Sequence, residues 1–243
     1  MRFSQQRLQT AFLLTLVLAG VNVSASFAPL SPVRYEASRS DCVPSIYEAR
    51  KQVEQYVDSG RYEHDVAKVV AKARAWLDKR VKTATKPAIV LDIDETSLSN
   101  WPEIRVNGWT RINNGPCDLE KGPCGHRAWQ AMAQSKAIAP TLALAQHARQ
   151  LGVAVFFITG RPEWLREPTE RNLHERGYEW TGLILEPEGA TFPSAADFKA
   201  PERSKIAAQG YTIILNVGDQ QSDLTGGFAE RTFKLPNPVY FVK

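Results

Sequence analysis

The sequence predicts an α/β protein built on a doubly wound parallel sheet. Four short apolar runs, at residues 88–91, 153–158, 183–185 and 213–217, are separated by segments with helical periodicity. Apolar runs of this length are typical of strands buried on both faces, and strands that alternate with helices form parallel sheets. The length of 243 residues and the hydrophobic content of 43% fit one folded domain with a modest insertion.

Residues 1–25 are predicted to be a signal peptide. Arg2 and Arg7 precede an apolar run over residues 11–23, and small residues around Ala28 follow it. The run is shorter than the roughly 20 apolar residues that a membrane-spanning helix needs, which favours cleavage over an uncleaved anchor. We therefore expect a periplasmic or secreted mature chain without a stable membrane anchor.

An irregular segment, residues 26–44, precedes the expected folded domain, residues 45–243. Two amphipathic helices are expected within residues 45–82, because apolar side chains recur there at helical spacing on either side of Gly60. These helices would form an N-terminal extension of the α/β core. Further helices are expected at residues 140–151, 162–176 and 201–209, and a last strand at 232–235.

The stretch 98–138 interrupts this alternation. It is rich in Gly, Asn, Pro and Trp and has no sustained period, so we interpret it as an insertion over the carboxyl edge of the sheet. Cys117 and Cys124 lie close together within it and would form a disulfide in an oxidising compartment, with two free thiols as the alternative. Cys42 is then the odd cysteine.

Acidic residues follow two of the predicted strands directly. Asp92 and Asp94 come after the first strand, and Asp219 and Asp223 come after the fourth. Ligands bind beyond the carboxyl ends of strands in an open parallel sheet, although an aspartate there is also a common helix cap. Four carboxylates at neighbouring strand ends repel one another unless a cation neutralises them, and a hard ion with oxygen ligands such as Mg²⁺ answers that need.

The second predicted strand, residues 153–158, is followed by Thr159 and Gly160. A hydroxyl group and backbone amides at this edge are suited to holding a phosphate oxygen. The alternative is a turn in which Thr159 caps a helix that starts at Pro162. The motif alone leaves both interpretations open.

With these motifs the chain resembles the haloacid dehalogenase (HAD) superfamily. The resemblance is to its secreted acid phosphatases, subfamily IIIB, a branch with plant vegetative storage proteins and bacterial class B and class C acid phosphatases. The motifs that carry it lie at residues 91–100, 156–161 and 216–224, in the family's order and spacing. The resemblance implies a Rossmann-like parallel sheet with a small cap insertion after the first strand.

The resemblance also implies the role of each site residue. Asp92 would be the nucleophile and Asp94 the acid/base. The phosphate would be bound by Thr159, Gly160 and Lys199, and Mg²⁺ by Asp92, the backbone carbonyl of Asp94, and Asp219, with Asp223 in support. Lys199 is preferred over Lys205 because its distance to Asp219 and the Arg203 that follows match the family pattern.

The activity implied by the resemblance is Mg²⁺-dependent hydrolysis of small phosphate monoesters, nucleotides among them, through an aspartyl-phosphate. An acid pH optimum is expected, with Asp94 starting protonated. The alternatives are a non-catalytic relative that stores amino acids or binds a phosphorylated ligand, a phosphotransferase, and a dehalogenase or phosphomutase of the same superfamily. Oligomeric state is left open.

Other features of the sequence are given a plainer interpretation. The formal net charge of +4 gives no reason to expect a nucleic acid polymer as partner. Trp101, Trp109 and Trp129 are interpreted as packing residues rather than as a platform for a base. The histidines lack the close pairing of a zinc site and are interpreted as surface or packing residues, namely His64, His126, His147 and His174.

Overall fold

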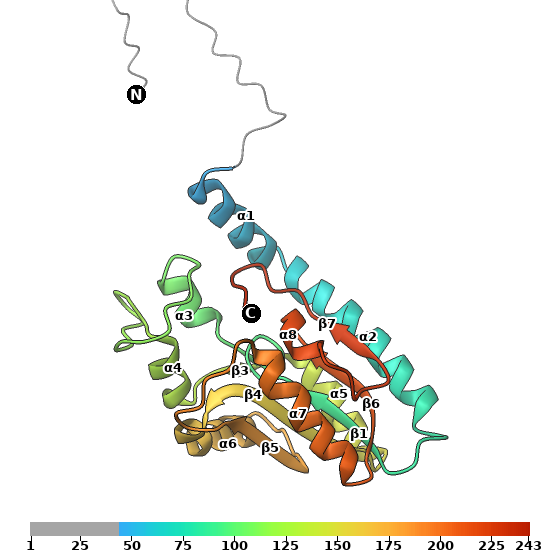
Figure 1. Ribbon diagram of the computed structural model, residues 1–243. Coiled ribbons are helices and arrows are strands. Elements are labelled where there is room, and N and C mark those ends of the chain that lie inside the picture. Colours follow the sequence, from blue (N-terminus) through green and yellow to red (C-terminus); the bar gives the residue numbers. More distant parts are fainter. Residues whose placement is uncertain (1–43) are drawn as a thin grey trace, which may run out of the picture. The chain divides into compact units, whose positions relative to one another are not determined.

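The computed structural model describes residues 44–243, in which helices and strands alternate (Figure 1). The predicted signal peptide, residues 1–25, and Cys42 lie outside the described residues. The main sheet contains β1 (Pro87–Leu91), β4 (Ala154–Pro162), β5 (Gly182–Glu186), β6 (Thr212–Gly218) and β7 (Thr232–Lys234). The longer helices are α1 (Ile46–Asp58), α2 (Arg61–Arg80), α5 (Ala139–Gln150), α6 (Arg166–Glu175) and α7 (Ala195–Ala208).

The strands of the main sheet are all parallel, in the order β5-β4-β1-β6-β7. The chain moves outward from β1 through β4 to β5, returns to the other side of β1 at β6, and continues to β7. This order confirms the predicted doubly wound sheet. The direction of winding reverses between β1 and β6, and ligands bind at such switch points, beyond the carboxyl ends of the strands.

Alternate residues of the strands point to opposite faces of the sheet. Ile89 and Phe157 belong to the larger core together with residues of α2 and α5, whereas Val90 and Phe156 belong to a smaller core with Phe198 of α7. In Figure 1, α2 (teal) and α7 (orange) lie on opposite sides of the strands. Because both faces are covered, the central strands β1, β4 and β6 are mostly apolar.

The two N-terminal helices form where the sequence predicts them. Ser45 begins α1 with a capping box in which Glu48 is the partner, and Gly60, with φ 76°, makes the turn into α2. Trp76 of α2 donates a hydrogen bond to the backbone carbonyl of Ile214 at 2.7 Å, which ties α2 to β6. The buried face of α2 consists of Tyr62, Val66, Val70, Ala73 and Leu77.

Helix α7 begins at Ala195, well before the start predicted at Pro201. The prediction followed the preference of proline for the first turn of a helix. In the structure Pro201 lies inside the helix, where its missing N–H removes one backbone hydrogen bond. The earlier start places Lys199 on the helix rather than in a loop.

Strand β4 continues through Pro162, where the sequence predicts the start of a helix. A short 3-10 helix, Glu163–Leu165, follows before α6 begins. The pairing of β4 with β5 shifts between Thr159 and Pro162, which leaves Gly160 and Arg161 in a bulge. Bulges often occur beside active sites because they redirect side chains. Thr159 therefore lies within the strand and does not cap a helix.

The segment 98–138 is more regular than the sequence suggests. Its ends pair as two short antiparallel strands, β2 (Leu98–Ser99) and β3 (Lys136–Ala137), and between them lie α3 (Trp101–Val106) and α4 (His126–Met132). Cys117 and Cys124 form the disulfide that was predicted for an oxidising compartment. None of the helices in residues 44–243 is long and apolar enough to cross a membrane.

Candidate active site

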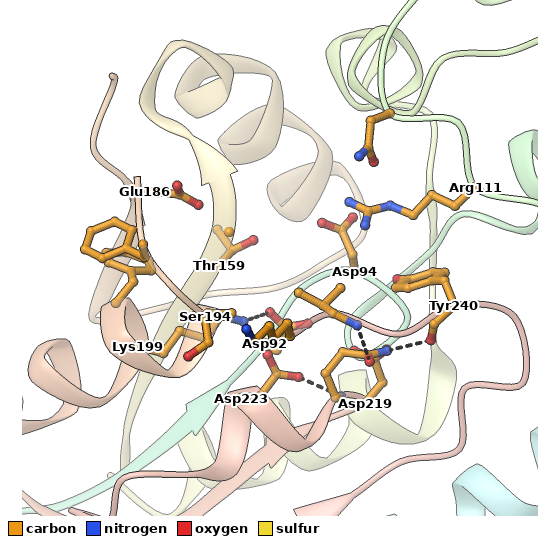
Figure 2. A pocket seen from close by; sticks show the side chains of 18 of the residues that line it. Asp92, Asp94, Arg111, Thr159, Glu186, Ser194, Lys199, Asp219, Asp223 and Tyr240 are labelled. Atoms are coloured by element: carbon orange, nitrogen blue, oxygen red, sulfur yellow. Dashed lines mark hydrogen bonds and ion pairs between the residues drawn. The ribbon is translucent and has the colours of Figure 1, made fainter. Parts of the chain in front are cut away.

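Three buried aspartates meet at the switch point of the sheet (Figure 2). Asp92 follows β1, whereas Asp219 and Asp223 follow β6, and one carboxylate oxygen from each lies within 4.8 Å of the others. Gly218 permits this approach, because a Cβ at that position would stand 2.4 Å from the Cβ of Asp223. The backbone of β1 continues the ladder here, since the Asp92 N–H donates to the Val217 carbonyl at 3.0 Å.

Burial makes ionisation of the clustered aspartates unfavourable. Asp92, Asp219 and Asp223 are each 7% exposed or less. Burial raises the pKa of Asp92 well above its ordinary value, and the neighbouring carboxylates add to the effect of burial. Burial, with the charge of Asp223, also raises the pKa of Asp219 to about 7.

Lys199 supplies one positive charge to this cluster from α7. Its ammonium group donates hydrogen bonds to Asp92 and, at 2.6 Å, to Asp223. Burial lowers the pKa of Lys199, but the two carboxylates outweigh burial and hold it above its ordinary value. Lys199 is 4% exposed, whereas the alternative candidate, Lys205, pairs with Glu202 at the surface.

One ammonium group leaves three carboxylates with a net negative charge in a buried site. A hard divalent cation with oxygen ligands suits this donor set. The side chain of Asp94 is not part of the cluster. The residues present therefore fit a divalent ion held by Asp92, Asp219 and Asp223.

Asp94 faces a different partner, the buried guanidinium of Arg161. Arg161 Nη2 lies 2.7 Å from Asp94 Oδ1 and Nε lies 3.2 Å from Oδ2, a two-pronged contact. Burial alone would raise the pKa of Asp94. The charge of Arg161 and its hydrogen bonds outweigh burial and hold this pKa well below its usual range. Without substrate, Asp94 therefore favours the carboxylate form, whereas the sequence led us to expect an acid that starts protonated.

A chain of hydrogen bonds from the insertion also holds Asp94. Gln130 Nε2 donates to Asp94 at 2.9 Å and to His126 Nε2 at 2.8 Å, and Asn100 donates to Asp94 at 2.9 Å. Since His126 Nε2 accepts, its Nδ1 carries the proton and donates to Glu103 at 2.7 Å. Asp94 is therefore fixed in orientation by α4 as well as by β4.

Thr159 and Gly160 line the same cavity as the aspartates. The Thr159 side chain is 1% exposed, and Figure 2 shows it beside Asp92 and opposite Lys199. The bulge in β4 frees Gly160 and Arg161 from regular strand pairing, so Arg161 turns toward Asp94 while Gly160 lines the cavity.

The cavity has a volume of about 350 Å³, within the range of sites for small molecules. The segment 237–243 forms one wall: Asn237 donates to Asp219 at 2.7 Å, and Tyr240 donates to the buried carboxylate of Glu95 at 2.5 Å. The other walls carry residues from the insertion and from the segment before α7, among them Arg111, Asn113, Arg127, Phe192 and Ser194.

Comparison with known proteins decides the family. Residues 17–243 match the profile of the HAD superfamily, subfamily IIIB (acid phosphatase). The chain belongs to this family. The resemblance seen in the sequence is thereby confirmed.

The relatives of this acid phosphatase family member include a stem glycoprotein, a vegetative storage protein and an acid phosphatase. It is 32% identical to the stem 28 kDa glycoprotein of Glycine max over 215 residues, covering 86% of this chain and 78% of the relative. It is 32% identical to vegetative storage protein 1 of Arabidopsis thaliana over 207 residues (83% and 73%). It is 34% identical to acid phosphatase 1 of Solanum lycopersicum over 155 residues (63% and 58%).

Among solved structures, the chain resembles the class C acid phosphatase of Bacillus anthracis. The TM-score is 0.63, with 21% identity over 79% of this chain and 86% of that one. At this identity the likeness supports the fold alone, and it agrees with the doubly wound sheet described above.

Sequence reasoning missed several residues that shape the site. Arg161 stands next to Thr159 and Gly160 in a quoted motif, yet nothing local reveals that its side chain reaches Asp94. His126 and Gln130 have helical spacing, i and i+4, which was the available signal for their contact. The tryptophans pack as expected: Trp101 stacks edge-on against Tyr62 at 5.0 Å, and none of Trp101, Trp109 and Trp129 lines the cavity.

Proposed function

We propose that the chain hydrolyses small phosphate monoesters through an aspartyl-phosphate formed on Asp92, with Mg²⁺ as the cation. The observation that carries the proposal is the convergence of three buried aspartates with Lys199 in one cavity. A phosphate dianion repels a carboxylate nucleophile, so positive charge must surround it before in-line attack. Bound Mg²⁺ would supply part of that charge, held by Asp92, the Asp94 backbone carbonyl and Asp219, with Asp223 in support.

In the first step, the Asp92 carboxylate attacks phosphorus and the bond from phosphorus to the ester oxygen breaks. We assign the phosphoryl oxygens to Lys199, the Thr159 hydroxyl and the backbone at Gly160, and the fact that all three residues line the cavity with Asp92 supports this assignment. Arg127 donates to the backbone carbonyl of Gly160 at 3.3 Å.

Asp94 is proposed to carry the protons. It gives one proton to the departing ester oxygen. In the second step it accepts one from the water that attacks the phosphorus of the phospho-aspartate, the phosphorus–oxygen bond to Asp92 breaks, and inorganic phosphate leaves. The carboxylate must be protonated before the first step, although Arg161 lowers its pKa in the free chain. Acid pH and the negative charge of an arriving phosphate dianion both favour protonation, which supports an acid pH optimum.

Two alternatives make different demands on the same cavity. A storage relative needs no intact nucleophile, yet this chain keeps Asp92 together with Lys199 and the bound orientation of Asp94. A phosphotransferase would use the same phospho-aspartate with an alcohol in place of water, and it differs only in the acceptor.

We infer a periplasmic or secreted enzyme, based on the N-terminal sequence.

The decisive experiment is hydrolysis of p-nitrophenyl phosphate by the purified chain without residues 1–25. We expect turnover at acid pH that EDTA removes and Mg²⁺ restores, and that Asp92→Asn abolishes. Glu175→Gln, at an exposed position of α6, is the matched control and should retain full activity. Wild-type turnover in Asp92→Asn would refute the nucleophile, and activity that ignores EDTA would remove the metal from the proposal.

A further inference from the structure

Two arginines of the insertion face the cavity without a carboxylate partner. Within residues 44–243, neither Arg111 nor Arg127 forms an ion pair. Arg127 donates only to neutral oxygens, the Gln130 side chain at 3.1 Å and the Gly160 carbonyl at 3.3 Å. The Nε of Arg111 is buried and has no hydrogen-bond partner, and its guanidinium lies 4.8 Å from the ring centre of Tyr240.

The other cations of the site are already committed. Lys199 pairs with Asp92 and Asp223, and Arg161 pairs with Asp94. Arg111 and Arg127 are therefore surplus to the charge balance of the aspartates. A partly buried guanidinium with unmet donors is costly, and an oxyanion of a ligand is the acceptor that best fits its planar fork of N–H groups.

Both arginines lie near Asp94, which indicates the part of a substrate that they meet. Gln130 accepts from Arg127 at 3.1 Å and donates to Asp94 at 2.9 Å. Figure 2 shows the Arg111 guanidinium directed toward Asp94, on the side of the cavity opposite Glu186. Asp94 is the proposed proton donor to the leaving group, so the groups next to it contact the leaving group rather than the phosphoryl group held by Lys199. A positive wall beside the leaving group selects for negative charge on that part of the substrate.

We propose that Arg111 and Arg127 form a second anion subsite, and that the preferred substrates are phosphate monoesters whose leaving group carries its own oxyanion. This inference rests on the proposed function. A carboxylate and a second phosphoryl group share the required chemistry, since both present paired oxygens to a guanidinium. The cavity of about 350 Å³ accommodates such a small, doubly charged ester.

The test is a series of esters that share a two-carbon leaving group and differ in its terminal charge. Phosphoglycolate carries a carboxylate, hydroxyethyl phosphate is neutral at that end, phosphoethanolamine is cationic, and ethylene glycol bisphosphate carries a second phosphoryl group. We expect kcat/KM for phosphoglycolate or the bisphosphate to exceed that for hydroxyethyl phosphate by about tenfold to a hundredfold, the usual effect of a charged hydrogen bond. Free Mg²⁺ is held equal, because these anions chelate it.

The variants Arg111→Met and Arg127→Met locate the effect. Each should lower kcat/KM for the doubly anionic esters at least about tenfold more than for hydroxyethyl phosphate, mainly through KM. Arg74→Met, which removes the same charge from an exposed position of α2, should leave both rates unchanged. Preference for the carboxylate over the bisphosphate, or the reverse, then identifies the oxyanion.

Several outcomes would overturn the subsite. Equal losses on all four esters would assign the arginines to the transferred phosphoryl group, and a preference for phosphoethanolamine would point to Glu186 as the selective residue. Hydrolysis of every ester at one rate by the wild type would reject the subsite but not the phosphatase. No hydrolysis of any ester, with p-nitrophenyl phosphate also inert, would instead reject the proposed function.

Discussion

Arg161 binds Asp94 through two hydrogen bonds, at 2.7 Å and 3.2 Å, and thereby holds the proposed proton donor as an anion until substrate arrives. The arginine is fully buried and emerges from the bulge of β4, so its position is set by the sheet rather than by a mobile loop. The protonation state of Asp94 therefore depends on a buried residue of the main sheet.

Arg161→Met should move the alkaline limb of the pH-rate profile to higher pH. Arg161 lowers the pKa of Asp94, so its removal raises that pKa and keeps the carboxyl group protonated at less acid pH. Loss of one partner of a buried pair also destabilises by about 3–5 kcal/mol, which thermal unfolding measures separately. Arg161→Lys should shift the limb less, since it retains the charge. An unmoved profile in both variants would show that Asp94 does not set the limb.

Asp94→Asn should slow turnover by about 10²–10⁴-fold, the usual contribution of a general acid/base. The loss in the first step should be smaller for p-nitrophenyl phosphate than for an alkyl phosphate, because nitrophenolate departs without a proton. Rapid-mixing measurement of the nitrophenol burst separates the two steps. A loss that is the same for both leaving groups would remove the acid role from Asp94.

Mg²⁺ should raise the thermal unfolding midpoint of the wild type relative to the same protein in EDTA. A ligand at about 100 times its Kd stabilises the folded state by about 2.7 kcal/mol, and here it also relieves repulsion among buried carboxylates. Asp219→Asn removes one of the three carboxylates and should reduce this shift by more than half. Glu175→Gln should show the full wild-type shift. A midpoint indifferent to Mg²⁺ would speak against the metal site.

Glu103 should make the folded state less stable as the pH rises toward 8. Burial raises the pKa of this carboxyl group from 4.5 to about 8, so between these values the folded state binds more protons than the unfolded state and stability falls with rising pH. His126, with a pKa lowered to about 3 by burial, acts in the opposite direction below about pH 6.5. Glu95 and Asp219, whose pKa values are raised to about 7 by burial, also contribute near neutrality, so the effect of Glu103 is obtained by comparison with a variant that lacks this carboxyl group.

Glu103→Gln isolates that contribution. From pH 7 to 8 the free energy of unfolding of the wild type should fall relative to this variant by about 1 kcal/mol. Urea denaturation at each pH gives the difference, with Glu63→Gln, at an exposed position of α2, as control. Parallel curves for wild type and Glu103→Gln would mean that the buried carboxyl group titrates as in the unfolded chain.

The sheet was predictable because its signal is local. Runs such as residues 213–217 are buried on both faces and need no partner to be recognised. The start of α7 was not predictable, because Pro201 has the sequence signal of a helix start, whereas the preceding turn contains Phe198, which packs against strand residues far away in the sequence. The aspartates were found from their place after strands, whereas the contacts of Asp94 with Arg161 and Gln130 depend on a bulge and a short helix that leave no periodic trace.

The wall formed by residues 237–243 determines what an incomplete chain would lack. Tyr240 reaches Glu95 across 145 positions of sequence, and Asn237 holds Asp219 in place. A growing polypeptide that has completed the sheet through β7 still lacks these contacts. A chain that ends before residue 237 would therefore carry every catalytic side chain proposed here but would lack one wall of the cavity, and Asp219 would keep the hydrogen bonds from Thr96 and Gln220 while losing the one from Asn237.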